Sequence, residues 1–223
     1  LPTTSPYLDG LNCESSIFSN IGSNAIVDWV LIEIIDETDN TKIVSSQSAL
    51  LQRDGDVVAI DGVSDLKFWL RSGSYFVAAK HRNHLAIMSA NSLALTETTS
   101  VLDFSNGNIA TYGSHAQTSL GMPVNTLGLW SGDSNGNNTV QYSGGTPEGP
   151  TLLSYVLNAP SNFLNLPTYS ILGYSATDLN LDGQTQYAGG NSEMPFVLQN
   201  VLSNPTNFLG LVTWPISEQL PGN

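Results

Sequence analysis

The C-terminal half of the chain contains an internal duplication, in which residues 125–169 align with residues 170–214 without a gap. Nineteen of the 45 aligned pairs are identical. A repeat changes how the whole region must fold, because each copy is one structural unit that buries its apolar face against a neighbour. Two copies are too few for a solenoid. We therefore expect a pseudo-twofold pair of units that share one apolar core.

Each copy begins with a loop in which every second side chain carries oxygen. Calcium takes 6–8 oxygen ligands, so this alternation in a tightly coiled loop is typical of a site for a hard cation. The sixth position holds Asn138 or Gly183, residue types that tolerate a left-handed backbone. The candidate ligands are Asp133, Asn135, Asn137, Thr139, Gln141 and Glu148 in the first copy, and Asp178, Asn180, Asp182, Gln184, Gln186 and Glu193 in the second.

The two loops predict one or two calcium ions that bind with unequal strength. The first loop offers the carboxylates of Asp133 and Glu148. The second loop offers three carboxylates, from Asp178, Asp182 and Glu193. Because fewer charged ligands generally give weaker binding, we expect the second site to be the tighter one. The alternative is a pair of Asn/Gly-rich turns that bind no metal.

A short helix is predicted after each loop, at residues 150–157 and 195–202. Each segment starts with proline, which the first turn of a helix tolerates because the missing N–H would have no partner there. Apolar residues then recur at helical spacing, which predicts that the two helices bury one face. These residues are Leu153, Val156 and Leu157 in the first copy, and Leu198, Val201 and Leu202 in the second.

Tandem D-x-N-x-(D/N) loops, each followed by an acidic residue and a short helix, resemble dockerin-type calcium modules. They are most similar to the dockerin-like repeats of secreted Bacteroidetes surface proteins. The resemblance implies EF-hand-type calcium binding in an exported protein. The chain departs from it at loop position 12, where the family has a carboxylate and this sequence has Gly144 or Gly189. We infer a lengthened loop in which Glu148 or Glu193, at position 16, supplies the bidentate ligand.

The N-terminal half predicts a β-sandwich of the immunoglobulin or transthyretin kind. Residues 25–36 are β-branched and apolar on both faces, which indicates a central strand. Further short strands are expected at 41–51, 57–60, 67–70, 74–80, 84–90 and 93–96, with a turn at 53–56. The fold class is therefore mainly β with a small α part. The predicted domains are an arm or edge strand at 1–24, the sandwich at 25–97, a surface linker at 98–124 and the calcium repeats at 125–223.

Three strings in this half carry a second resemblance. They are DWVLIE at 28–33, SALLQRDGD at 48–56 and YFVAAKHRNHL at 75–85. They are similar to the β-sandwich module that precedes the dockerin-like repeats in the same exported proteins. The resemblance implies an architecture and an origin in a Bacteroidetes-type bacterium, and it implies little about activity.

The charge of the chain excludes several partners. The net charge is −13, and all six Lys and Arg residues lie between Lys42 and Arg82. A chain without a basic footprint is a poor nucleic-acid binder, and an acidic chain is repelled by anionic lipid. No apolar run approaches the roughly 20 residues of a membrane span. The single cysteine, Cys13, cannot form a disulfide within the chain, and we expect it to be buried.

Residues 80–84 (KHRNH) form the most enzyme-like cluster. If the segment is one strand, His81 and Asn83 share one face while Arg82 and His84 share the other, so the two histidines would not readily hold one metal ion. The third histidine, His115, lies in the predicted linker. No nucleophile elbow, P-loop or dinucleotide fingerprint is present. We therefore interpret the chain as a protein without catalytic activity.

These observations favour a structural function. The leading hypothesis is a calcium-stabilised extracellular surface or matrix protein that self-assembles, for example as a filament subunit, or docks to another surface protein. In an assembly, residues 1–24 are the candidate for adding a strand to a neighbour's sheet. The alternative is a carbohydrate-binding or adhesin module, which needs an exposed aromatic platform. We expect Trp29 to lie in the core and Trp130 and Trp214 to pack between the repeats.

Overall fold

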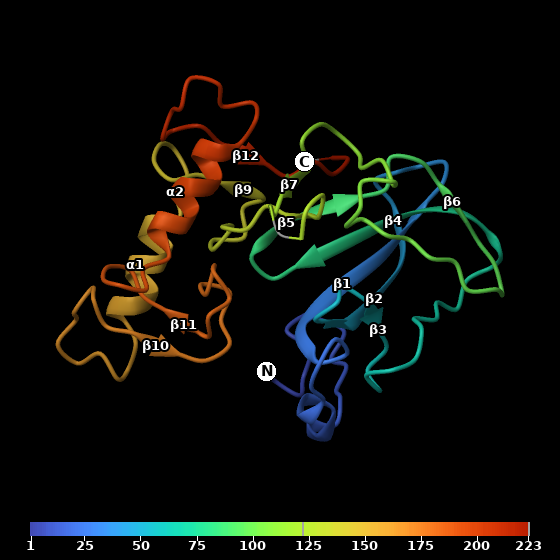
Figure 1. Cartoon of the computed structure of the whole chain (residues 1–223), viewed down its shortest axis with the longest axis horizontal. Helices are drawn as coiled ribbons and strands as arrows, with labels where there is room; N and C mark the ends of the chain where they lie inside the picture. Colours follow the sequence, from blue (N-terminus) through green and yellow to red (C-terminus); the bar gives the residue numbers. More distant parts are fainter. Residues whose placement is uncertain (122, 223) are drawn as a thin grey trace.

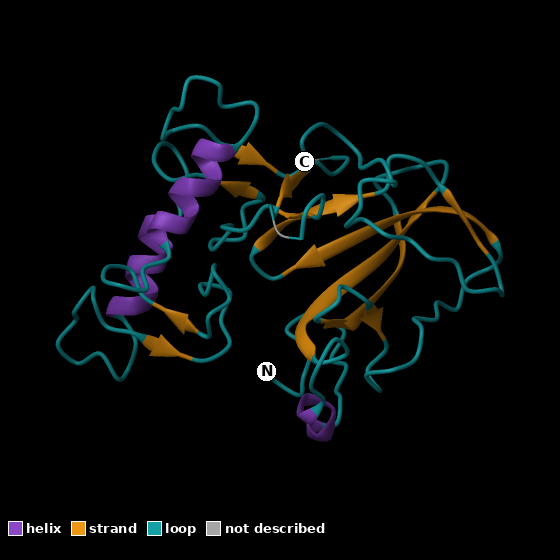
Figure 2. Ribbon diagram, in the orientation of Figure 1, coloured by secondary structure: helices purple, strands orange, loops and turns teal. Residues whose placement is uncertain are grey.

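The computed structural model describes residues 1–121 and 123–222, and within them the fold is mainly β with two α-helices (Figures 1 and 2). The strands of the N-terminal half form a six-stranded antiparallel sheet in the order β3-β2-β1-β4-β5, with β6 paired to β4. Its strands are β1 (Ile26–Asp36), β2 (Ile43–Gln52), β3 (Val57–Val58), β4 (Gly73–His81), β5 (His84–Met88) and β6 (Leu93–Leu95).

Strand β1 is central in the sheet, as predicted, because both of its faces are apolar. It pairs with β2 on one side and with β4 on the other. Trp29 lies in one buried cluster with Cys13 and Leu50, whereas Val30 and Ile32 lie in a second cluster. Successive side chains of a strand point to opposite faces. Both faces of the sheet are therefore covered by other parts of the chain.

A two-sheet sandwich is not confirmed, because the described strands of this half form one sheet. The prediction of a strand at residues 67–70 is wrong. That segment is irregular, and its covering residues Leu66, Phe68 and Leu70 pack against one face of the sheet. The alternating apolar residues of this segment therefore cover a face of the sheet, and the segment does not pair with a strand.

The N-terminal residues fold back onto their own sheet instead of extending as an edge strand. The indole Nε1 of Trp29 donates to Pro2 O at 2.9 Å, and Tyr7 Oη donates to the carbonyls of Trp29 and Lys80. The backbone N–H of Ser48 in β2 donates to the Asp9 carboxylate at 2.6 Å. A short 3-10 helix, η1 (Ser15–Ser19), follows. Because the arm is engaged on its own chain, it is not a free strand for a neighbour.

Residues 98–121 run beside the sheet and contain strand β7 (Gln117–Ser119). Tyr112 N donates to Met88 O at 2.8 Å, so this segment continues along the β5 edge. Strand β7 pairs with β8 (Leu127–Leu129), which begins the first repeat. The predicted linker therefore covers the sheet and leads into the duplicated region.

The duplicated region packs two helices against each other, as the repeat predicts. Helix α1 (Gly149–Leu157) buries Leu152 and Val156, and helix α2 (Met194–Ser203) buries Val197 and Val201. Both helices lie at the side of the molecule away from the sheet (Figure 1). The predicted apolar stripe is partly wrong. In α2, Val197 is buried together with Val201, whereas Leu202 is 43% exposed.

Each loop is closed by a two-stranded ladder with a segment that follows the other copy's helix. Strand β10 (Ile171–Leu172), after α1, pairs with β11 (Gln184–Thr185) of the second loop. Strand β12 (Ile216–Ser217), after α2, pairs with β9 (Thr139–Val140) of the first loop. Residues 171 and 216 are 45 positions apart, which is the repeat length. By the repeat boundaries, β10 belongs to the second copy and closes that copy's own loop, whereas β12 lies just past the second copy and closes the first loop.

Candidate metal centre

The two loops adopt the same conformation, held by the aspartate at position 1. In the first loop, Asp133 Oδ1 and Oδ2 accept the backbone N–H groups of Asn137 and Asn138 at 3.0 and 2.9 Å. Asn138 has a φ of 62° and Gly183 a φ of 81°, which confirms the left-handed conformation predicted for position 6. The carboxylate of Asp133 therefore fixes the conformation of the backbone up to Asn138 through two hydrogen bonds.

The second loop repeats these bonds at the equivalent atoms. Asp178 Oδ1 accepts from Asp182 N at 3.1 Å and Oδ2 accepts from Gly183 N at 3.0 Å. Position 3 contributes in both loops, since Asn180 Oδ1 accepts from Asp182 N at 2.9 Å and Asn135 Oδ1 from Asn137 N at 3.1 Å. The duplicated sequence thus produces a duplicated geometry.

A glutamate at the start of each helix points into its loop. Glu148 and Glu193 are both completely buried. One oxygen of each is satisfied, because Glu148 Oε2 accepts from Ser134 N at 3.0 Å and Glu193 Oε2 accepts from Leu179 N at 3.0 Å. The other oxygen, Oε1, has no hydrogen-bond partner among the described residues in either copy.

A buried carboxylate oxygen is costly when it gives up bulk water and no protein group donates a hydrogen bond to it. Across residues 1–121 and 123–222, these two Oε1 atoms are the only buried side-chain polar atoms that lack a partner. Both occupy the same position of the repeat. This coincidence indicates a requirement of the loop rather than a local packing error.

Burial shifts the acidity of the loop carboxyls in a common direction. Desolvation raises the pKa of Glu148 and of Glu193 to about 7. Desolvation also raises the pKa of Asp133 and Asp178 above its usual range. Buried carboxylates of like charge, without a nearby cation, favour the protonated form. A divalent cation bound between them would remove this penalty.

The second loop gathers three acidic side chains into one group. Carboxylate oxygens of Asp178, Asp182 and Glu193 all lie within 4.8 Å of one another. This cluster, two of whose members are buried, could hold a metal ion. In the first loop, position 5 is Asn137, so the equivalent group has the two carboxylates of Asp133 and Glu148.

The side chains predicted at positions 7 and 9 have other partners or lie at the loop margin. Gln141 Nε2 donates to Thr213 O and Gln186 Nε2 donates to Thr168 O, both at 2.7 Å. Their Oε1 atoms accept the backbone N–H groups of Thr146 and Asn191. These two glutamines therefore tie each loop to its closing segment. Thr139 and Gln184 lie in the short strands β9 and β11.

The geometry also accounts for glycine at position 12. Gly144 and Gly189 have φ values of 131° and 129°. A Cβ on Gly144 would lie 2.7 Å from Gln141 Nε2, and one on Gly189 would lie 2.6 Å from Gln186 Oε1. A carboxylate side chain does not fit there. The glutamate four residues later approaches the loop from the helix instead.

The turn between β4 and β5 contacts position 1 of both loops, which the sequence did not predict. The Asn83 side chain is buried, and its Nδ2 donates to Asp178 O at 2.6 Å. The backbone carbonyl of Asn83 accepts from Gly132 N at 2.9 Å and from Asp133 N at 3.2 Å. One residue of the sheet thus holds the start of both loops.

Arg82, beside it in the turn, extends the same contact. Its Nε donates to Ser175 O at 2.9 Å, and its guanidinium lies 4.0 Å from the Tyr174 ring centroid. Nη1 forms an ion pair with Asp28, and Tyr174 Oη donates to the same carboxylate at 2.8 Å. The sheet and the second repeat are therefore joined by a buried ionic and aromatic contact.

The predicted placement of the histidines on opposite faces is wrong. The chain reverses at Arg82 and Asn83, so His81 and His84 are cross-strand partners. Their Nδ1 atoms are 2.8 Å apart, and His81 Nε2 lies 3.0 Å from Asp28 Oδ2. Burial lowers the pKa of His84 well below its usual range. These contacts give the imidazoles a structural partner each.

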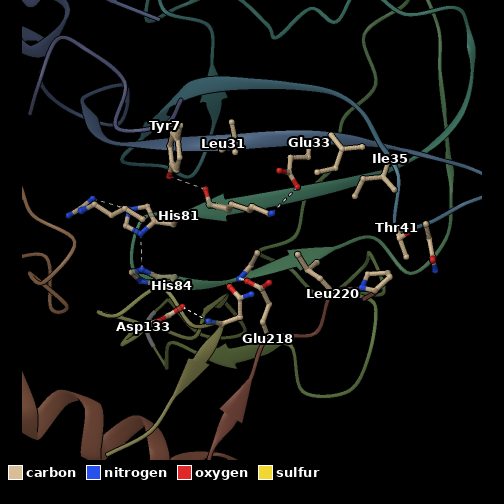
Figure 3. Close-up of a pocket in the computed structure, with 18 residues that line it drawn as sticks. Tyr7, Leu31, Glu33, Ile35, Thr41, His81, His84, Asp133, Glu218 and Leu220 are labelled. Carbon is tan, nitrogen blue, oxygen red and sulfur yellow. Dashed lines mark hydrogen bonds and ion pairs between the residues drawn. The ribbon is translucent and has the colours of Figure 1, made fainter. Parts of the chain in front are cut away.

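Both histidines border a pocket of about 320 Å³ between the sheet and the first loop (Figure 3). Its walls include the Glu33–Lys80 ion pair, 3.1 Å long, together with Asp133 and Glu218. The pocket therefore mixes acidic and basic groups with apolar side chains. His115, the third histidine, is not among the residues that line it.

The aromatic predictions are confirmed for three of the four tryptophans. Trp29 and Trp130 are buried, and Trp214 packs against the core of the two repeats. Cys13 is buried and free, as expected. Trp69 is 99% exposed. Trp69 is consequently the tryptophan that is available to a ligand at the surface.

Comparison with known protein families, curated proteins and solved structures finds no match for this chain. Within the described residues, neither helix has the length and apolar character needed to cross a membrane.

Proposed function

We propose that the chain is a structural protein of the cell exterior whose duplicated loops bind calcium and thereby hold the repeat region rigid. The supporting observation is the pair of buried, unpartnered Oε1 atoms on Glu148 and Glu193. Each faces a loop of inward oxygens at the same position of the repeat. Calcium is favoured over softer metals because the surrounding side chains offer oxygen ligands.

In the second loop, Asp178, Asp182 and Glu193 would hold the ion together with Asn180. In the first loop, Asp133 and Glu148 would do so with Asn135 and Asn137. A bound ion adds its binding free energy to the stability of the folded state, since the unfolded chain has no assembled site. The extracellular location and the resemblance to dockerin-like surface proteins belong to the same proposal, in which the rigid unit self-assembles or docks to another surface protein.

The deciding experiment compares Glu193→Gln and Glu148→Gln with the exposed control Glu97→Gln by calcium titration calorimetry and thermal unfolding. Each loop variant is expected to lose one binding site and the calcium-dependent rise in melting temperature that the site provides. In chelator, each should be at least as stable as the parent, because a buried charge is removed. A parent protein that binds no calcium would sink the proposal.

The carbohydrate-binding alternative rests on the exposed indole of Trp69. One exposed ring is less than the platform of several rings that this function needs. The structural function therefore remains the better supported of the two.

A further inference from the structure

One part of this acidic chain carries no charge. Residues 149–177 and 194–217 contain no Asp, Glu, Lys or Arg, although the whole chain has 6 basic and 19 acidic residues. These segments comprise α1, α2 and the loops that follow them. Ordinary protein surfaces are rich in charged side chains. A neutral face on a chain of net charge −13 is therefore unusual.

The same face exposes large apolar side chains at equivalent positions of the two copies. Phe163 is 85% exposed and Leu164 65%, while Phe208 is 83% exposed and Leu209 66%. The remaining exposed apolar residues of these segments include Tyr155, Leu166, Leu202 and Leu211. Large apolar side chains that are exposed in such number indicate an interaction site on a folded protein.

The loops that display these residues are built by a buried asparagine. Asn162 Nδ2 donates to Val156 O and Leu166 O at 2.8 and 2.9 Å, and its Oδ1 accepts from Leu166 N at 2.9 Å. Asn207 makes the same three bonds with Val201 and Leu211. The phenylalanine and leucine that follow each asparagine are thus turned outward by a fixed backbone, and the fold leaves them uncovered.

The two loops lie at the two ends of the helix pair, on the side of the molecule away from the sheet (Figure 1). The loop after α1 leads to β10, and the loop after α2 leads to β12. We call the exposed, uncharged surface of these two tips and of the helices between them the Phe-Leu face. It comprises residues 153–166 and 198–211.

We infer that the Phe-Leu face is a self-association surface that binds a second copy of this chain. The inference deepens the proposed function, because it names the partner and the surface of the assembly. Two copies of net charge −13 repel each other, and they approach at least cost where neither carries charge. A symmetric dimer also requires a self-complementary patch. In such a dimer the loop after α1 of one copy would meet the loop after α2 of the other, and the reverse contact would form at the same time.

The exposed area of the Phe-Leu face determines how much of it must be buried in a stable dimer. Burying Phe163, Leu164, Phe208 and Leu209 at roughly 150 Å² each would cover on the order of 600 Å² per copy. A stable interface needs about 800 Å² per partner, which the half-exposed leucines and Tyr155 can supply. One loop alone falls well short of this area. Both loops must therefore contribute to the same contact.

Analytical ultracentrifugation of the full chain in calcium, over a range of concentrations, tests this surface. Three variants are compared with the parent: Phe163→Ser with Leu164→Ser, Phe208→Ser with Leu209→Ser, and all four substitutions together. The control is Trp69→Ser with Val101→Ser, which removes equally exposed apolar groups elsewhere. Calorimetry on the same samples records calcium binding, so that a failure of the metal sites is recognised separately.

The parent is expected to self-associate, and each double loop variant should weaken association by about tenfold or more, because truncating a central aromatic anchor is costly. Added salt should strengthen association by screening the repulsion. The control should behave like the parent. Assemblies that persist in the fourfold variant would overturn the inference. A calcium-bound parent that stays monomeric at high concentration would also overturn the inference. The same holds if this monomer sediments with phosphatidylcholine vesicles, because the face would then bind lipid.

Discussion

At the scale of single residues, Glu148 and Glu193 carry a cost of burial that either protonation or a bound cation can offset. Each leaves one buried carboxylate oxygen without a donor among the described residues. Replacing such a glutamate by glutamine relieves the buried charge and removes a metal ligand in the same step. The loops are therefore sites where stability without metal and affinity for metal are opposed.

The pH dependence of stability follows from the same two groups. In metal-free protein the pKa of Glu148 and Glu193 is raised to about 7, whereas an ordinary glutamate has a pKa of 4.5. Between these values each glutamate holds a proton in the folded chain that it releases in the unfolded chain, so the contribution of these two groups to stability is largest below about pH 4.5 and is lost as the pH rises to about 7. The loss is up to roughly 3 kcal/mol per glutamate.

Urea unfolding in chelator at pH 5 and pH 8 checks this direction, with the Glu148→Gln/Glu193→Gln double variant as the control that should show a smaller change. Saturating calcium should reverse the trend, because the metal needs deprotonated carboxylates. A double variant whose stability changes between pH 5 and pH 8 as much as that of the parent would contradict the assignment of these pKa shifts.

Position 5 should set the difference between the two sites. Asn137→Asp gives the first loop the third carboxylate that Asp182 provides in the second. We expect its calcium affinity to rise about tenfold, and Asp182→Asn to lower that of the second site by a similar factor, because ligand charge tunes affinity. Calorimetry in the Glu193→Gln and Glu148→Gln backgrounds isolates the two sites. Equal affinities in all variants would refute the charge explanation.

At the scale of elements, the β4–β5 turn contacts both loops through different atoms of one residue. The side chain of Asn83 bonds to Asp178 O, whereas its backbone carbonyl bonds to Gly132 N and Asp133 N. Substitution of the side chain removes the first contact and leaves the others. The turn thus offers a way to perturb one metal loop from outside it.

Asn83→Ala is expected to weaken calcium binding at the second site several-fold and to leave the first site nearly unchanged. The variant should also lose about 1–3 kcal/mol of stability, since a buried carbonyl is left without its donor. Calorimetry measures the two affinities, with Asn106→Ala in an exposed turn as the control. A uniform loss at both sites would indicate general destabilisation instead of a positioning role.

The local sequence predicted the elements better than it predicted their partners. Both helices, β1 and the left-handed position 6 followed from nearby residues alone. The reversal at Arg82 and Asn83 did not, because the segment 80–84 has the composition of a strand. The pairing of β12 with β9 was also missed, because residues 216–217 lie far in sequence from residues 139–140. Nothing in the spacing of residues 67–70 revealed that no strand was available to pair with them.

At the scale of the whole molecule, the two halves share a core. Leu85 of β5 lies in one buried cluster with Trp130, Leu152 and Val197 of the repeats. Leu85 N donates to Trp130 O at 2.8 Å, which continues the sheet edge into the duplicated region. Metal removal should therefore act first on the repeats and reach the sheet only through this shared core.

Hydrogen exchange should reveal that gradient. On chelation, amides of Asn137, Asn138, Asp182 and Gly183 should exchange faster, because the aspartates that hold them lose the ion that orders the loops. Amides in β1 should keep their protection. Mass spectrometry of peptides from the two regions makes the comparison. Equal loss of protection in β1 would mean that calcium holds the entire molecule rather than the repeats.

The pairings of β10 and β12 have a consequence for how the duplicated region is completed. Strand β10 follows α1 and closes the second loop, while β12 follows α2 and closes the first. The first loop therefore receives its closing strand from beyond the second copy, which joins the start of the duplicated region to its end. A polypeptide cut short before residue 216 would leave β9 without its partner, while β10 and β11 could still pair.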